Sequence, residues 1–317
     1  MKSHRSSKPS PAAILVVPLV VAVVLTLFAW PNARLEPRDL PIGVAGPAPA
    51  AQAVEKQLAA GEASFEVHRY AGEAEAREAI EDREVYGAFV ATAAGPKVLT
   101  ASGGSPAVAQ LLTHAASESG QPAQVEDVVP AERGAALVSS VLPLLIAGIV
   151  TGVLTVFLAS GALGRVALVV AGSVLAGLAA TAIVQSWLDV VEGNWVANAA
   201  ALSLTVLAIA SFVAGLQALL GEAGIILAAL AMVLVGNLFS AVGSAPELLP
   251  EPVGGIGQLM PPGAGGNLLR STGFFDGAGA GGHIAVLTIW ALAGVLALVV
   301  ASARERREAP AAPVTAA

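Results

Sequence analysis

The chain has 317 residues, of which 56% are hydrophobic and only 12% charged, and its mean hydropathy is +0.75. Soluble domains carry about 25% charged residues, so this composition excludes an ordinary soluble protein and indicates a membrane protein. The net charge of −7 argues against nucleic acid as a partner, because phosphate binding requires Lys and Arg. The absence of cysteine excludes disulfides and thiolate metal sites.

A first membrane span is predicted at residues 12–30, which contain no charge and end at Trp30. About 20 apolar residues cross the hydrocarbon core. Residues 1–11 carry Lys2, Arg5 and Lys8 and form the predicted cytoplasmic N-terminus. The alternative is a cleaved signal peptide, whose apolar core is about 7–15 residues long. The longer stretch and the spans that follow favour an uncleaved first span.

An acidic soluble domain is predicted at residues 31–134. Residues 31–135 hold 8 Lys/Arg and 15 Asp/Glu, a balance of 8 − 15 = −7, whereas the rest of the chain carries 8 of each and is neutral. Strand and helix patterns alternate, which is typical of an α/β layer. The expected strands are 40–45, 65–70, 85–91, 97–101 and 125–129, and the expected helices are 51–60, 73–83 and 106–116.

Five further spans follow, so the predicted fold class is a polytopic α-helical membrane protein. It has six transmembrane helices and a small extracytoplasmic α/β domain between the first two. The five spans are residues 135–159, 166–188, 196–220, 225–242 and 284–303. Small residues such as Gly177 and Gly215 are expected to let these helices approach closely.

The distribution of positive charge predicts the orientation. If the spans alternate, the N-terminus, Arg165 and the tail 304–317 share one side, which the positive-inside rule makes cytoplasmic. Both termini are therefore expected in the cytoplasm and the chain in the cell (inner) membrane.

The spans contain no Asp, Glu, Lys or Arg away from their ends, which argues against a proton relay. The neutral side chains Gln185, Asn198 and Asn237 are candidates for a translocation path, although each also fits a helix–helix hydrogen bond. None of the four lysines follows a Gly-rich turn, so the chain has no phosphate-binding loop of its own. Any ATPase must be a separate subunit.

No catalytic group, cofactor site or metal site is predicted, and the chain is not expected to be an enzyme. His68 and His114 each lack a second ligand at metal-binding spacing. Asp276 and His283 alone come near an acid–base pair at the membrane edge.

The Gly/Pro-rich outer loop at residues 243–283 leaves two interpretations open. It could form a re-entrant segment that dips into the membrane at Pro261, Pro262 and Arg270, where protein must bury the irregular backbone. It could equally be a flexible surface linker.

This layout resembles the permease subunits of ABC-2-type transporters, and is closest to the YhgE/Pip-like branch. The local similarities are LPIGVA at 40–45, which resembles the strand that opens the family's outer domain, EAREAIEDREVYGAFV at 75–90 and LMPPGAGGNLLR at 259–270. The resemblance implies a homodimer or heterodimer that binds a separate ATP-binding subunit and exports lipids, polysaccharides, drugs or peptides.

The function expected from this resemblance is the membrane subunit of an exporter for a lipidic, amphipathic or drug-like substrate. Contact with the ATPase is expected at the exposed loop residues Gly161, Arg165 and Glu222. The connection at 160–165 is short for the family's coupling helix. The alternative is therefore a non-transporting, membrane-anchored receptor or scaffold, whose outer domain binds an envelope component or partner.

Overall fold

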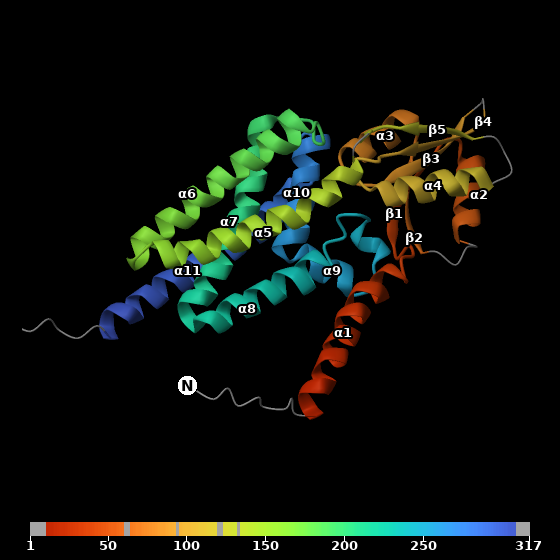
Figure 1. Cartoon of the computed structure of the whole chain (residues 1–317). Helices are drawn as coiled ribbons and strands as arrows, with labels where there is room; N and C mark the ends of the chain where they lie inside the picture. The colour runs from red at the N-terminus through yellow and green to blue at the C-terminus, as the bar shows by residue number, and fades with distance from the viewer. Residues whose placement is uncertain (1–10, 60–63, 93–94, 119–122, 132–133, 309–317) are drawn as a thin grey trace, which may run out of the picture.

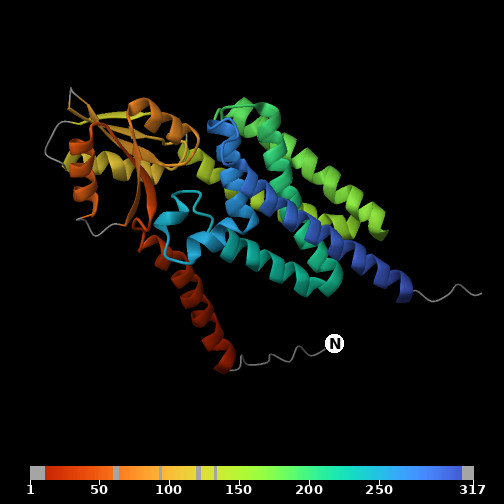
Figure 2. The same ribbon diagram turned by 180° about the vertical axis from the view of Figure 1, so that it is seen from behind.

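The computed structural model describes residues 11–59, 64–92, 95–118, 123–131 and 134–308. The predicted N-terminal segment 1–11 lies outside the described residues except for Pro11, and the predicted tail 304–317 is described only as far as Glu308. The chain forms a sheet domain at one end of a helical bundle, and the first helix leads away from both (Figure 1, Figure 2).

The sheet domain contains a five-stranded mixed sheet in the order β2-β1-β3-β4-β5. β1 pairs in parallel with β2 and β3, β3 pairs antiparallel with β4, and β4 pairs in parallel with β5. The strands are β1 Leu40–Ala45, β2 Phe65–Tyr70, β3 Gly87–Thr92, β4 Gly95–Thr100 and β5 Gln124–Asp127, and the helices are α2 Ala48–Ala59, α3 Glu73–Glu81 and α4 Pro106–Glu118. The predicted α/β layer is confirmed.

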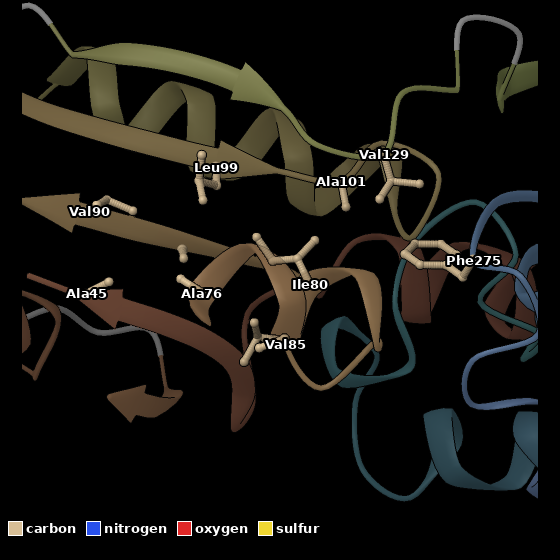
Figure 3. Packing of buried hydrophobic residues seen from close by; sticks show 11 residues of the cluster. Ala45, Ala76, Ile80, Val85, Val90, Leu99, Ala101, Val129 and Phe275 are labelled. Carbon is tan, nitrogen blue, oxygen red and sulfur yellow. The ribbon is translucent and has the colours of Figure 1, made fainter. Parts of the chain in front are cut away.

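Both faces of this sheet are covered, which explains why β1 is an almost continuous apolar run. On one face, Ile80 of α3 packs with Ala45 and Leu99, while Leu112 of α4 packs with Ile42 on the other. Figure 3 shows Phe275, from the helical part of the chain, beside Val129 and Ala101 at the edge of the first cluster. The sheet domain and the bundle therefore share a hydrophobic core.

The helical part contains four helices that are long and apolar enough to cross a membrane, among the residues described. They cover Ser140–Leu158, Gly161–Trp187, Trp195–Leu220 and Ala280–Arg307. The helices themselves are α5 Gly134–Leu158, α6 Gly161–Thr181 with a π-helical end Ala182–Trp187, α7 Trp195–Leu220 and α11 Ala280–Glu308. Four of the six predicted spans thus coincide with helices that are long and apolar enough to cross a membrane.

The predicted first and fifth spans coincide with shorter apolar helices, Pro18–Asn32 and Glu222–Asn237. The first belongs to α1, Pro11–Asn32, and the second comprises α8, Glu222–Leu230, and a π-helical segment, Ala231–Asn237. The fifth ends at Asn237 instead of residue 242, and in the turn that follows Ser240 Oγ donates to the backbone oxygen of Asn237 at 2.7 Å.

Helix α7 is the centre of the bundle. In its apolar window 67% of the residues are buried, against 22–28% in the other three long helices. Glycines bring its neighbours close: Gly177 of α6 faces the backbone of Ser203, and Gly294 of α11 faces the backbone of Ser211. The expected role of small residues in helix packing is confirmed.

The loop predicted at 243–283 is mostly helical, so the surface-linker interpretation is corrected. It contains a 3-10 turn Pro246–Leu248, α9 Val253–Gln258 and α10 Pro261–Phe274. Twelve of the 14 residues of α10 are buried, and α10 lies against α7 and α11. Pro261 and Pro262 occupy the first turn, where a missing N–H costs no helical hydrogen bond.

Candidate functional site

The sheet domain is fastened to α10 by Arg83, which follows the last turn of α3. Its guanidinium donates to the backbone oxygen of Asn267 at 3.2 Å, to Asn267 Oδ1 at 3.2 Å and to Ser271 Oγ at 3.1 Å. It also lies 5.2 Å from the centroid of the Phe275 ring. Burial lowers the pKa of Arg83 from its usual value, while the nearby Tyr86 and Glu247 oppose that shift.

A second polar contact lies beside this one. The Tyr86 hydroxyl donates to Glu247 Oε2 at 2.9 Å, across the junction between the sheet domain and the segment before α9. Burial, and then the charge of Glu247, raise the pKa of Tyr86 far above its usual value, so Tyr86 stays neutral and acts as a donor.

Arg270 lies on α10 and is only 1% exposed. It donates to the backbone oxygen of Val242, and its Nε has no hydrogen-bond partner among the described residues. A buried arginine is costly unless its donors are satisfied. The hydrogen bond from Arg270 connects α10 to Val242, in the segment that follows the fifth apolar helix.

Arg83, Tyr86 and Glu247 line a polar cavity of about 430 Å³, to which Arg270 does not contribute. Its lining includes the arginines Arg38 and Arg83, the carboxylates of Glu247 and Glu251, and the imidazole of His283. Arginines and carboxylates balance in number, so the cavity has no clear preference for one sign of charge. Asp276 lines a different hollow from His283, and the described residues hold no group of three metal-ligating side chains.

An apolar groove of about 560 Å³ lies on the opposite face of α10. Helices α5, α6, α7 and α10 contribute to it, and no described lining residue is ionisable. Its lining residues are Ser140, Val141, Pro143, Leu144, Leu145, Ala147, Ala176, Ala179, Ala180, Ile183, Val184, Leu188, Val190, Leu202, Thr205, Ile209, Pro262, Gly265, Gly266 and Leu269. Ile183 and Leu188 are 45% and 44% exposed, so part of the groove lining lies at the surface of the bundle.

The candidate path residues Gln185, Asn198 and Asn237 are only partly brought together. Asn198 Nδ2 donates to Gln185 Oε1 at 2.9 Å and to the backbone oxygen of Glu192, and Gln185 Nε2 donates to the backbone oxygen of Gly193. This pair fixes the connection between α6 and α7. Asn237 lies at the end of the fifth apolar helix, away from that connection.

The candidate ATPase contacts Gly161, Arg165 and Glu222 lie at the bundle end far from the sheet domain (Figure 1). Arg165 is 9% exposed, which corrects the expectation of an exposed side chain. It donates to Ser302 Oγ and to both carboxylate oxygens of Glu305, so it ties α6 to α11. Glu222 is exposed at the start of α8.

Sequence patterns did not single out Arg83, Tyr86 or Glu247. A charged residue at the end of a short acidic helix looks like any solvated side chain, and its partners are 184 and 188 positions away. The apolar groove could not be predicted from the sequence either, because the Ala, Gly and Leu residues that line it are common in all membrane helices.

Comparison with known proteins returns no matching family model, curated protein or solved structure. By its fold, the chain is a helical protein with four described helices long and apolar enough to cross a membrane, and a mixed-sheet domain docked on a buried helix.

Proposed function

We propose that the chain is the membrane subunit of an exporter of the ABC-2 type, energised by a separate ATP-binding subunit. The observation that carries this proposal is the apolar groove between α5, α6, α7 and α10, part of whose lining lies at the surface of the bundle and whose described lining holds no ionisable group. A hollow of this size falls within the range of small-molecule sites, about 300–1,000 Å³. The groove suits a lipidic or amphipathic substrate that enters from the membrane.

The proposed orientation follows from charge. Arg165, Arg304 and Arg307 lie at the bundle end far from the sheet domain, while Asp189 and Glu192 lie in the connection near it. The positive-inside rule makes the far end cytoplasmic and the sheet domain extracytoplasmic. The ATP-binding subunit would then dock at the far end, where Glu222 is exposed, and the chain would work in the cell membrane as a dimer, in contact with lipid.

A second candidate is a non-transporting receptor or scaffold. The specific observation in its favour is the shortness of the far-end connections: only Ala159 and Ser160 separate α5 from α6, and only Gly221 separates α7 from α8. An ATPase would find no separate coupling helix there. In this alternative the sheet domain binds an envelope component and the helices act as an anchor.

Purification of the full chain from its native membrane in a mild detergent separates the two candidates. The exporter proposal predicts that an ATP-hydrolysing subunit co-purifies, and that deletion of the chain alters envelope lipid composition or drug efflux. A preparation without any ATPase, together with unchanged lipids and efflux in the deletion strain, would refute export and favour the receptor.

A further inference from the structure

We infer that docking of the sheet domain through Arg83 regulates the apolar groove, because α10 is both the helix on which the domain docks and a wall of the groove. Arg83 is thereby a positioning residue for the substrate, although it lies outside the groove lining. This inference rests on the proposed function and specifies how the same site is regulated.

Helix α10 lies between the groove and the contact with the sheet domain. Its groove-lining residues are Pro262, Gly265, Gly266 and Leu269. A helix turns by about 100° per residue, so Asn267 and Ser271 lie on the other side of α10. These two residues accept the three hydrogen bonds from the Arg83 guanidinium. A single helix therefore separates the groove from the residue that fastens the sheet domain.

Hydrogen bonds continue beyond Arg83 on this polar side of α10. Asn267 Nδ2 donates to Gln258 Oε1 at 2.6 Å, and Gln258 Nε2 of α9 donates to the backbone oxygen of Ser240 at 3.0 Å. These bonds connect the sheet domain, through α10 and α9, to the segment that follows the fifth apolar helix. Because hydrogen bonds depend on distance and angle, this set fixes both the rotation and the axial position of α10.

The wall that α10 contributes to the groove is formed partly by backbone. Gly265 and Gly266 have no side chains, and a Cβ atom at Gly265 would lie 2.4 Å from Cγ2 of Thr205, another residue of the lining. Apolar packing of this kind is non-directional, and packed helices can slide over one another by small amounts. A shift of α10 would therefore change the width of the groove directly.

Docking and substrate binding are therefore expected to be linked. The groove is observed with the sheet domain docked, so docking should favour binding in the groove. By thermodynamic linkage, a bound substrate must then stabilise docking by the same factor, and such coupling is typically about 5- to 150-fold in affinity. An arginine with a purely structural role would hold the sheet domain and leave binding in the groove unchanged.

The test measures labelling of the full chain, in nanodiscs of zwitterionic lipid, by a photoreactive alkyl probe with an uncharged polyoxyethylene head. Arg83→Ala should raise the probe concentration needed to label peptides of α5, α6 or α10 by about fivefold or more. Arg77→Ala is the matched control, because Arg77 lies on α3, the helix that precedes Arg83, and pairs with Glu126 of the sheet instead of α10. This control should leave labelling unchanged.

Ser271→Ala is a milder variant of the same contact. It removes one of the three hydrogen bonds and leaves the Arg83 guanidinium in place. Labelling should weaken in the same direction as in Arg83→Ala and by a smaller factor.

Two alanines of α6 show whether labelling reports the groove. Ala179 is exposed and lines the groove, whereas Ala171 is exposed and is not part of the lining. Ala179→Trp should fill the groove and reduce labelling, and Ala171→Trp should leave it unchanged.

Hydrogen–deuterium exchange gives a measurement that a purely structural role of Arg83 would not affect. In the unaltered chain the probe should slow exchange in the turn at residues 82–86, which contributes no residue to the groove lining. In Arg83→Ala the same probe should leave exchange in this turn unchanged, because the link between α10 and the turn is lost.

Equal labelling of the unaltered chain and Arg83→Ala would overturn the inference and leave the groove as a binding site. The same conclusion would follow if the probe did not slow exchange at residues 82–86 in the unaltered chain. Labelling that ignores Ala179→Trp would overturn both the groove site and its regulation. The proposed export is read separately, from whether an ATPase co-purifies.

Discussion

Replacing Gly294 with alanine is expected to destabilise the helical bundle by about 3 kcal/mol, the upper part of the usual range for overpacking. A Cβ atom at this position of α11 would lie 2.3 Å from the backbone carbon of Ser211 and 2.5 Å from the backbone nitrogen of Phe212. Backbone of the central helix α7 cannot yield as a flexible side chain can. The midpoint of thermal unfolding, measured in detergent, should fall by roughly 6–12 °C.

Gly281→Ala is the matched control in the same helix. A Cβ at Gly281 meets no atom within 4 Å, and alanine favours a helix over glycine by up to about 1 kcal/mol. This variant should therefore unfold at the same temperature as the unaltered chain or slightly above it. Equal behaviour of the two variants would show that α7 and α11 do not approach as closely as described.

Replacing Arg83 with alanine is expected to loosen the sheet domain from α10 at a cost of about 3 kcal/mol. Hydrogen bonds from a charged donor contribute about 1.5–3 kcal/mol each, and the lost bonds act as one group. The variant removes all three contacts to Asn267 and Ser271. Hydrogen–deuterium exchange of the full chain should speed up in α10 and leave the centre of α7 protected.

Arg83→Gly serves as the comparison, because Arg83 has a backbone φ of 62°. This left-handed conformation costs a non-glycine residue roughly 1–2 kcal/mol, and glycine adopts it freely. The glycine variant should thus lose the same contacts and still be more stable than the alanine variant. Unchanged exchange in α10 for both variants would contradict the fastening role of Arg83.

The elements that could be predicted from the sequence are those whose local pattern agrees with their surroundings. β1 and β2 have the predicted bounds, 40–45 and 65–70, because an apolar run and an alternating run fit a covered and an edge strand. The central span, predicted at 196–220, is observed as Trp195–Leu220 for the same reason. An uncharged run of that length has few alternatives to a buried or membrane helix.

α10 could not be predicted, because its local signal opposes its structure. Gly disfavours a helix by about 1 kcal/mol per interior residue, and α10 contains four glycines within Pro261–Phe274. Tertiary packing overrides this preference: Gly265 lies against Thr205 of α7, where any side chain would collide. The groove and the Arg83 contact depend on α10, so neither could be located from the sequence.

The polar residues predicted to line a path or to contact a partner connect helices to one another instead. Gln185 and Asn198 do meet, but their hydrogen bonds close a connection between helices. Arg165 was placed in a loop and instead bridges two helices through Glu305. Polar side chains in an apolar chain identify where helices contact one another more readily than where a substrate passes.

The most direct test of a lipid-like substrate site is native mass spectrometry of the full chain released from membrane nanodiscs. The unaltered chain and Ala171→Trp should each retain one amphipathic molecule, and Ala179→Trp should retain none, because Ala179 lines the groove and Ala171, on the same helix, does not. Equal retention by all three proteins, or no retained molecule on the unaltered chain, would contradict the account.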